Sequence, residues 1–343
     1  MISVHPLTAL RQIAFLLERE LAPTYRVRAF RNAADVVARQ GDGEIAARAA
    51  AGTLEELPGV GKVTAAVISE ALAGDTPDYL ARLRQQAGPL VDLTTAADEI
   101  CQALQGDLHT HSDWSDGGSP IEEMAVTGIE LGNAYQVLTD HSPRLTVANG
   151  LTAERLERQL AVLADLAPRL GEFRLLSGIE VDILDDGALD QRPDLLRRLD
   201  VVVASVHSKL AMESGAMTRR MLTAIADPNT NVLGHCTGRM RGGRRDRPPS
   251  SFDAEAVFAA CAEHGVAVEI NSRPERMDPP PELLTLAVQA GCLFSIDSDA
   301  HAPGQLDWKP YGAAKAAECG VPLDRIVNTW PVDRLLEWAR KPS

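Results

Sequence analysis

The sequence lacks the cysteine spacing that a disulfide framework or a sulfur-bound zinc site needs. Its five cysteines are an odd number, and no two of them form a Cys-x-x-Cys pair. Regularly spaced, even-numbered cysteines are typical of small secreted scaffolds, and Cys-x-x-Cys pairs are typical of zinc sites. We therefore expect buried, reduced thiols, and a metal bound by this chain would have nitrogen and oxygen ligands.

Long apolar runs are also absent. No stretch approaches the roughly 18 uncharged apolar residues that a membrane helix needs. The N-terminus has no basic segment followed by an apolar segment and a cleavage site. The apolar fraction of 45% is that of a globular protein. We expect a cytoplasmic protein that does not bind a membrane.

Positive charge is scarce as well. The chain has 34 basic and 48 acidic residues, and its formal net charge is −14. A protein that coats nucleic acid needs a broad basic surface, so that class is excluded and any contact with DNA must be local. A length of 343 residues favours two domains over one. The sequence leaves the oligomeric state open.

The first 85 residues have the pattern of a small all-α domain. Apolar residues such as Leu10, Ile13 and Leu17 recur at spacings of three and four, which is the period of an amphipathic helix. A further helix is expected at residues 62–73, and Gly74 would end it. We therefore expect one helical domain over residues 1–85.

A short glycine turn precedes that last helix. Thr53 and Glu56 have the spacing of a capping box, and Gly59 and Gly61 follow in a Leu-Pro-Gly-Val-Gly run. Without Cβ atoms, glycines let the N–H groups at a helix N-terminus approach a phosphate closely. An ordinary helical hairpin would use the same glycines only to make its turn, so the turn alone leaves both interpretations open.

Two segments make the interpretation specific. Residues Leu54–Ile68 resemble the helix-hairpin-helix DNA-binding motif, and Tyr25–Ala34 resemble the second helix of the N-terminal domain of family X DNA polymerases. Some members of that family use a lysine as a Schiff-base nucleophile where this chain has Val67, so the resemblance does not imply a lyase. It implies DNA binding by Gly59, Gly61, Lys62 and Arg28, with Arg26 and Arg31 as further available cations.

The pattern changes after a linker that we expect at residues 86–105. Short apolar runs then alternate with helical patterns over residues 106–343, which indicates an α/β domain with a parallel sheet. The predicted strands are residues 106–109, 135–139, 173–179, 201–206, 231–234, 266–270 and 292–297.

Six of the eight histidines stand at the ends of these strands. His109 and His111 are two residues apart, so a strand would project both from one face, and Asp116 follows in a turn that can fold back toward them. An isolated His-x-His pair is common on a surface, but active sites of parallel barrels gather at the C-terminal strand ends. The endings are His109 and His111, Asp140 and His141, Glu180, His207, His235, Glu269 to Asn271, and Asp299 with His301. Together they favour a multinuclear metal site.

These endings resemble the PHP (polymerase and histidinol phosphatase) family of metal-dependent phosphoesterases, from Gly106 to the end of the chain. The resemblance is most specific to the PHP domain that bacterial family X polymerases carry at their C-terminus, through residues 234–239, 269–276 and 327–331. It implies a distorted seven-stranded (β/α)7 barrel. The polymerase domain that separates the two ends of those enzymes is missing here.

The resemblance also implies two or three divalent ions. Their implied ligands are His109, His111, Glu180 and Asp299 for one ion, Glu180, His207 and His235 for a second, and Asp116, His141 and His301 for a third. Imidazole and carboxylate ligands suit Zn, Mn or Fe. Metal-bound water is a nucleophile toward phosphorus. The expected catalytic residues are therefore three of the implied metal ligands, Glu180, His207 and Asp299. Asp140 either orients a ligand or caps a turn.

Arginines gather just after His235. Such a loop is usually solvated, but planar guanidinium groups beside a phosphoesterase site suit bidentate contacts with phosphate. The expected substrate-binding residues are Arg239, Arg241, Arg244 and Arg245 of this loop, together with Arg273 and Arg276, which follow the next predicted strand.

The leading hypothesis is therefore a metal-dependent phosphoesterase acting on DNA ends, as a 3′-to-5′ exonuclease or a 3′-end-processing enzyme of DNA repair. The expected partner is DNA, as a single strand or a 3′ end. One alternative is a small-molecule phosphatase of the histidinol-phosphatase type, with the helical domain as a cap or an oligomer contact. Another is a non-catalytic DNA-binding module. The presence of competent residue types at all nine ligand positions argues against that last alternative.

Overall fold

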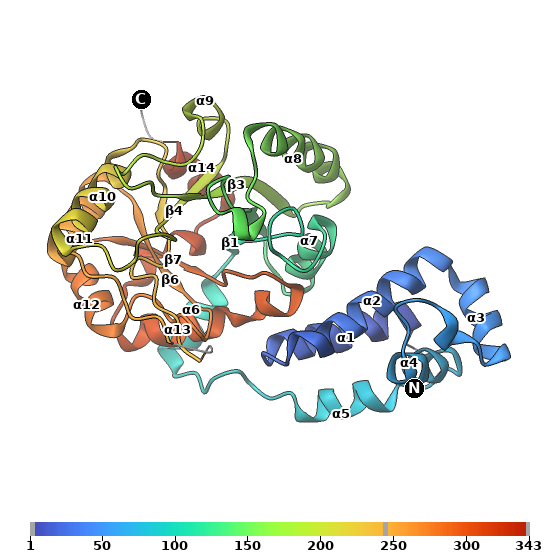
Figure 1. Ribbon diagram of the computed structural model, residues 1–343. Coiled ribbons are helices and arrows are strands. Elements are labelled where there is room, and N and C mark those ends of the chain that lie inside the picture. Colours follow the sequence, from blue (N-terminus) through green and yellow to red (C-terminus); the bar gives the residue numbers. More distant parts are fainter. Residues whose placement is uncertain (1–3, 243–245, 341–343) are drawn as a thin grey trace. The chain divides into compact units, whose positions relative to one another are not determined.

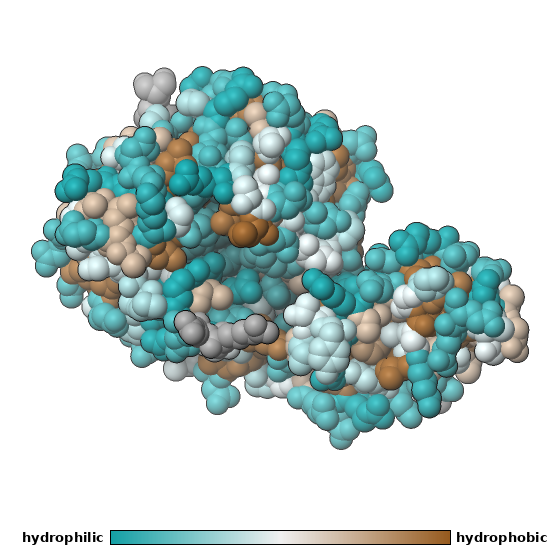
Figure 2. All heavy atoms as spheres, viewed as in Figure 1, coloured by the Kyte–Doolittle hydropathy of each residue, from teal (hydrophilic) through white to brown (hydrophobic). Residues whose placement is uncertain are grey.

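The computed structural model describes residues 4–242 and 246–340 and divides the chain into two compact units, Met1–Pro89 and Leu90–Ser343 (Figure 1). None of the helices in those described ranges is long and apolar enough to cross a membrane. The visible face of each unit is mostly hydrophilic, and hydrophobic side chains occur there in small separate groups (Figure 2).

Unit 1 is all-helical, as the sequence predicted. Helix α1 packs against α2, α4 and α5, and the apolar residues Leu10, Ile13 and Leu17 lie in its buried core. The elements are α1 (Pro6–Arg19), α2 (Thr24–Gln40), α3 (Asp42–Ala51), the 3-10 turn η1 (Leu54–Glu56), α4 (Lys62–Leu72) and α5 (Asp78–Gln86).

The predicted capping box at Thr53 is wrong. The Thr53 side chain caps none of the described residues, and Leu54–Glu56 form a single 3-10 turn. One of the two bonds of such a box occurs at α4 instead, where the Gly61 N–H donates to Thr64 Oγ1 at 2.9 Å. Gly61 has no side chain to make the other bond, and the Thr64 hydroxyl donates to the Gly61 carbonyl at 3.0 Å. A Thr-x-x-Glu spacing therefore did not locate the helix start, because the glycine turn comes between Glu56 and α4.

Unit 2 is a parallel seven-stranded sheet whose strands pair in sequence order, which confirms the predicted (β/α)7 architecture. Contacts between β1 and β7, and a bridge from Thr110 to Ala300 just after β7, bring the two edges together into a nearly closed barrel. The strands are β1 (Gly106–Thr110), β2 (Tyr135–Leu138), β3 (Arg174–Asp182), β4 (Val201–Ser205), β5 (Val232–Leu233), β6 (Ala267–Asn271) and β7 (Leu293–Asp297).

Helices surround the strands (Figure 1). They are α6 (Thr95–Ala103), α7 (Ile121–Glu130), α8 (Ala153–Leu166), α9 (Pro193–Leu196), α10 (Ser214–Ala226), α11 (Ala254–His264), α12 (Pro281–Ala290), α13 (Lys309–Glu318) and α14 (Val332–Ala339). Short 3-10 turns follow β2 (Thr146–Ala148), α8 (Ala167–Arg169) and β7 (Pro303–Trp308), and two more precede α14 (Leu323–Arg325 and Val327–Thr329). Helix α6 packs against α13.

Strand β4 shows why the sheet is so apolar. Val201 and Val203 lie in one buried cluster with Leu335 of α14, whereas Val202 lies in another with Phe258 of α11. Alternate side chains of a strand point to opposite faces, so both faces of this strand are covered. Continuous apolar runs, such as the three valines of β4, are the result.

The C-terminal segment closes one end of the barrel. The Asn231 amide donates to the Ala339 carbonyl of α14 at 2.8 Å, and the Tyr135 hydroxyl donates to the Trp330 carbonyl at 3.0 Å. Asn231 precedes β5 and Tyr135 begins β2, so this segment covers the N-terminal ends of the strands. The candidate ligands follow the opposite, C-terminal ends.

Candidate metal centre

The histidines at the strand ends lie against one another. His109 and His111 of β1 and its end are fully buried, and their ring centroids are 5.1 Å apart. The His111 ring lies 4.5 Å from that of His141 and 4.2 Å from that of His301, centroid to centroid. His207 lies 5.2 Å from both His141 and His235. The fold therefore brings all six strand-end histidines into one cluster.

Glu180 of β3 lies at the centre of this histidine cluster. Its buried carboxylate contacts five histidines through both oxygens. Oε1 lies 2.8 Å from His235 Nε2 and 3.2 Å from His207 Nε2, and Oε2 lies 2.9 Å from His141 Nδ1, 3.2 Å from His109 Nε2 and 3.6 Å from His111 Nε2. This is the geometry of a carboxylate that bridges more than one cation.

Three groups of side chains have donor atoms close enough for a shared ion, all within 4.8 Å of one another. They are His109, His111 and Glu180; His141, Glu180 and His207; and His111, Asp116, His141 and His301. Asp299 Oδ1 adds to the first group, at 3.8 Å from His109 Nε2 and 3.4 Å from His111 Nε2. The sequence did not show that His141 also reaches Glu180, because that contact depends on the bridge between the end of β2 and β3.

Ring nitrogens without a well-aligned hydrogen bond test whether the site fits a metal. Both ring nitrogens of His111 and of His207 are buried and make no such bond with a described residue, although carboxylate oxygens lie close to them, for example Glu180 Oε1 at 3.2 Å from His207 Nε2. Buried polar atoms almost always have a partner, so an imidazole cluster without one fits a bound cation. The donor set is imidazole and carboxylate, which suits divalent transition metals.

The electrostatics of the cluster favour neutral imidazole ligands at two positions. Burial, helped by the neighbouring His301 and His141, lowers the pKa of His111 to about 3. Burial and the nearby Arg276 likewise lower the pKa of His235 to about 3. A metal ligand must be deprotonated, so these two side chains are ready to bind at neutral pH.

Glu180 and His207, in contrast, have pKa values shifted toward their charged forms. Burial opposes charge on Glu180, but His109, His207 and His141 hold the pKa of this carboxyl well below its usual range. Burial would lower the pKa of His207, but Glu180 and Asp182 raise it to about 9. The site therefore keeps a buried negative charge that needs positive charge around it.

Two buried aspartates, Asp140 and Asp182, form hydrogen bonds that hold the segments carrying proposed ligands. Asp140 accepts hydrogen bonds from the Ser112 N–H and hydroxyl, at 2.8 and 2.6 Å, and from the Ser115 hydroxyl at 2.5 Å, so it holds the loop that carries Asp116. Asp182 accepts from the His207 N–H at 3.0 Å. The sequence showed Asp140 beside a histidine, but Asp182 gave no such signal because it lies 25 residues before His207.

Only some of the expected substrate-binding arginines lie near the proposed metal ligands. Arg276 Nε lies 3.0 Å from Asp299 Oδ2, and Arg273 Nη1 lies 3.3 Å from His301 Nδ1, so both reach the ligand set. Arg239 is buried, and its guanidinium donates to the carbonyls of Arg276 and Met277. Arg241 is exposed. The remaining two, Arg244 and Arg245, lie outside the described residues.

The expected DNA-binding residues of unit 1 lie at the surface. Gly59, Gly61 and Lys62 form the turn into α4, and Arg28 is exposed on α2. Arg31 is not an available cation, since its side chain is buried and makes two hydrogen bonds with Glu18, at 2.8 and 2.7 Å.

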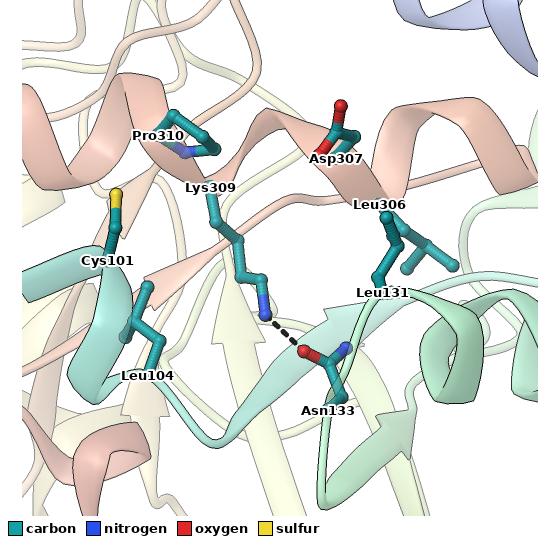
Figure 3. Close-up of a pocket in the computed structure, with 8 residues that line it drawn as sticks. All are labelled: Cys101, Leu104, Leu131, Asn133, Leu306, Asp307, Lys309 and Pro310. Atoms are coloured by element: carbon teal, nitrogen blue, oxygen red, sulfur yellow. Dashed lines mark hydrogen bonds between the residues drawn. The ribbon is translucent and has the colours of Figure 1, made fainter. Parts of the chain in front are cut away.

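A separate small pocket lies at the other end of the barrel (Figure 3). Lys309 points into it and donates to Asn133 Oδ1 at 2.6 Å and to the Gly106 carbonyl at 3.4 Å. Gly106 begins β1 and Asn133 precedes β2, so this pocket is remote from the histidine cluster. Its lining contains no histidine.

Comparisons with known proteins match both halves of the chain. A helix-hairpin-helix domain model matches residues 4–77, and a PHP domain model matches residues 107–273. The DNA polymerase/3′-5′ exonuclease PolX of Bacillus subtilis is 37% identical over 246 residues, which are 71% of this chain and 43% of that protein. This chain thus matches less than half the length of that relative.

Shorter proteins are similar over nearly their whole length. A probable phosphatase of Caldicellulosiruptor saccharolyticus is 29% identical over 247 residues, which are 69% of this chain and 96% of that protein. Among solved structures, the histidinol phosphate phosphatase of Lactococcus lactis, complexed with zinc, L-histidinol and phosphate, has a TM-score of 0.45 at 18% identity. That match covers 63% of this chain and 94% of the Lactococcus chain.

Proposed function

This chain joins a helix-hairpin-helix domain to a PHP domain, and we propose that it hydrolyses phosphodiester bonds at DNA ends. The PHP match confirms the predicted enzyme class, a metal-dependent phosphoric ester hydrolase. We propose removal of 3′-terminal nucleotides or of blocked 3′ ends as the reaction. The name of the Bacillus relative, a 3′-5′ exonuclease, supports this polarity.

The observation that carries the proposal is the set of contacts around Glu180. One buried carboxylate within 3.6 Å of five imidazoles supports a centre of two or three divalent ions. The proposed ligands are His109, His111, Asp116, His141, Glu180, His207, His235, Asp299 and His301. When bound there, such ions supply a water of lowered pKa and stabilise negative charge on the phosphoryl group.

Arg276 and Arg273 are the proposed phosphate-binding residues. Arg276 is mostly buried beside Asp299. Its Nε pairs with Asp299 Oδ2 at 3.0 Å, and its Nη1 has no hydrogen-bond partner among the described residues. Arg273 reaches His301 and also lies over the Trp308 ring, 5.9 Å from its centroid. Two guanidinium groups fixed in this way can bind and orient a phosphate oxygen next to the ligand cluster.

Unit 1 supplies the proposed contact with DNA. Gly59 and Gly61 lie at the exposed turn into α4, where backbone N–H groups at a helix N-terminus favour phosphate, and Lys62 adds a cation. A DNA strand bound there would be a polymer substrate. A small-molecule phosphatase does not need such a DNA-binding surface.

The second candidate is a phosphatase of small monoesters. The probable phosphatase from Caldicellulosiruptor favours this alternative, because the match covers 96% of that protein. The rest of that protein is too short to hold a domain of the length of unit 1. Under this alternative, unit 1 has no role in catalysis.

Specificity constants for two substrates separate the candidates. The full chain, loaded with Mn²⁺ or with Zn²⁺, is given a labelled single strand or an aryl phosphate monoester. We expect kcat/KM to be higher for the strand. A higher kcat/KM for the monoester would replace the proposal with the phosphatase alternative, and no turnover of either substrate would reject both.

A further inference from the structure

Glu269 of β6 is a buried carboxylate that the proposed set of metal ligands does not use. Its Oε1 lies 2.6 Å from His109 Nδ1, and both side chains are fully buried. Its Oε2 accepts the His235 backbone N–H at 2.5 Å and the Asn271 amide at 3.2 Å. Both oxygens of Glu269 are therefore occupied by donors that belong to, or adjoin, the metal centre.

The links continue through Asn271. The same amide nitrogen lies 3.1 Å from Asp299 Oδ2, so Glu269 and Asp299 share one donor. Strand β6 contributes no proposed ligand, yet its last residues contact one ligand within β1 and two that follow β5 and β7.

The contact with His109 decides which ring nitrogen is free. A neutral imidazole carries its hydrogen on one nitrogen and its lone pair on the other, and a carboxylate can only accept. Glu269 therefore holds the hydrogen on Nδ1. The Nε2 lone pair is left to face Glu180 Oε2 at 3.2 Å and Asp299 Oδ1 at 3.8 Å, which is the direction of the proposed ion.

We infer that Glu269 is a positioning residue that fixes the tautomer and ring orientation of His109 and thereby sets the affinity of the ion held by His109, His111 and Glu180. The inference rests on the proposed function, in which His109 is a metal ligand. Carboxylates behind metal-binding histidines act in this way, and their loss typically weakens metal binding by roughly 10–100-fold.

Glu269→Gln isolates the role because it keeps the shape of the side chain. A carboxylate accepts at both oxygens, whereas an amide accepts at one position and donates at the other. The variant can satisfy either His109 Nδ1–H or the His235 N–H, but it opposes the second with its own NH₂ group. If the NH₂ faces His109, the hydrogen moves to Nε2 and blocks the position that would bind the ion.

The test measures metal affinity of the full chain by competition with a chromophoric chelator. We expect Glu269→Gln to bind one equivalent of Zn²⁺ roughly 10–100-fold more weakly than the wild type, with the other equivalents unchanged. Asp200→Asn is the matched control, because Asp200 precedes the N-terminal end of β4 and accepts from the Ser177 N–H and hydroxyl of β3. Its affinities should equal those of the wild type.

Equal affinities in Glu269→Gln and the wild type would overturn the inference, as would an equal loss in the Asp200→Asn control. A wild type that binds no metal at all would instead reject the proposed function. A second measurement needs no variant of Glu269: long-range ¹H–¹⁵N spectra of the zinc-loaded wild type should show His109 with its hydrogen on Nδ1. A hydrogen on Nε2 would overturn the inference even if Glu269→Gln failed to fold.

Discussion

Glu180 shows how a single residue organises the proposed site. An unpaired carboxylate in a protein interior is strongly destabilising, and the imidazoles around Glu180 compensate its charge. A divalent ion would compensate this charge better than protons on histidines, and it would use the ring nitrogens of His111 that make no well-aligned hydrogen bond with a described residue. The side chain is thus arranged for cations rather than for packing.

Glu180→Gln should abolish turnover and lower the amount of bound metal. The amide cannot bridge two ions, so we expect at least about a 100-fold loss of phosphoesterase activity, since the metal-bound water is the proposed nucleophile. Metal analysis and a turnover assay measure the two effects. Asp186→Asn, at an exposed carboxylate, is the control and should behave as the wild type. Full metal content and activity in Glu180→Gln would contradict the assignment.

Arg276→Ala should separate substrate binding from metal binding. Its guanidinium contacts Asp299 but is not a ligand, so the metal content should persist while kcat/KM falls by about 100-fold, the scale for losing a charged donor to phosphate. The exposed Arg219→Ala is the matched control. A large loss of bound metal in Arg276→Ala would show that this arginine serves the metal centre instead.

At the scale of elements, the existence of each strand was easier to predict than the C-terminal strand ends that hold the proposed metal ligands. The buried valine run of β4 was predicted at 201–206 and found at Val201–Ser205. Strand β3 was predicted to end at residue 179 but continues to Asp182. The prediction stopped too early because Glu180 and Asp182 are polar residues that face the histidine cluster and interrupt the apolar pattern.

Long-range side-chain pairs were not predictable from local patterns. Arg31 looked like a cation available for DNA, but its partner Glu18 lies 13 residues earlier on α1. Arg239 looked like a phosphate ligand, but it binds carbonyls 37 and 38 residues further along the chain. Residue types at strand ends could be recognised from the sequence, whereas the partner of each side chain depends on the packed fold.

The hairpin before α4 depends on Gly59. Its φ angle is +101°, and a Cβ atom there would lie 3.2 Å from Val36 Cγ2 of α2. Gly59→Ala should therefore destabilise unit 1 by about 1–2 kcal/mol and weaken DNA binding. Gly43→Ala is the control, because a Cβ at that helical position meets nothing within 4 Å and alanine is the better helix former.

The four tryptophans allow this effect to be measured unit by unit. All of them lie in unit 2, at positions 114, 308, 330 and 338. In urea, the Gly59→Ala substitution should shift the part of the far-ultraviolet circular dichroism transition that belongs to unit 1, and it should leave the tryptophan fluorescence transition unchanged. A shift of both transitions would mean that the two units unfold together.

At the scale of the whole molecule, each unit has its own buried core. The apolar cluster of Leu10, Ile13 and Ile68 is confined to unit 1, and the clusters that contain Val202 and Val203 are confined to unit 2. All nine proposed metal ligands also lie in unit 2. Chemistry and DNA binding are therefore proposed for different units.

Deletion of residues 1–89 should separate these two roles. We expect the remaining unit to hydrolyse an aryl phosphate diester within a few-fold of the full chain, because the ligand set is intact, and to cleave DNA much more slowly at low substrate concentration. Steady-state kinetics on both substrates provide the test. An equal loss on both would mean that unit 1 completes the active site.

The proposed metal centre should cleave DNA from its 3′ end. The most direct test compares a 5′-labelled linear single strand with a closed circle of the same sequence, each incubated with the Mn²⁺-loaded full chain. We predict that the linear strand shortens stepwise from its 3′ end, that a chelator stops the shortening, and that the circle stays intact. Cleavage of the circle at the rate of the linear strand, or shortening from the 5′ end, would contradict the account.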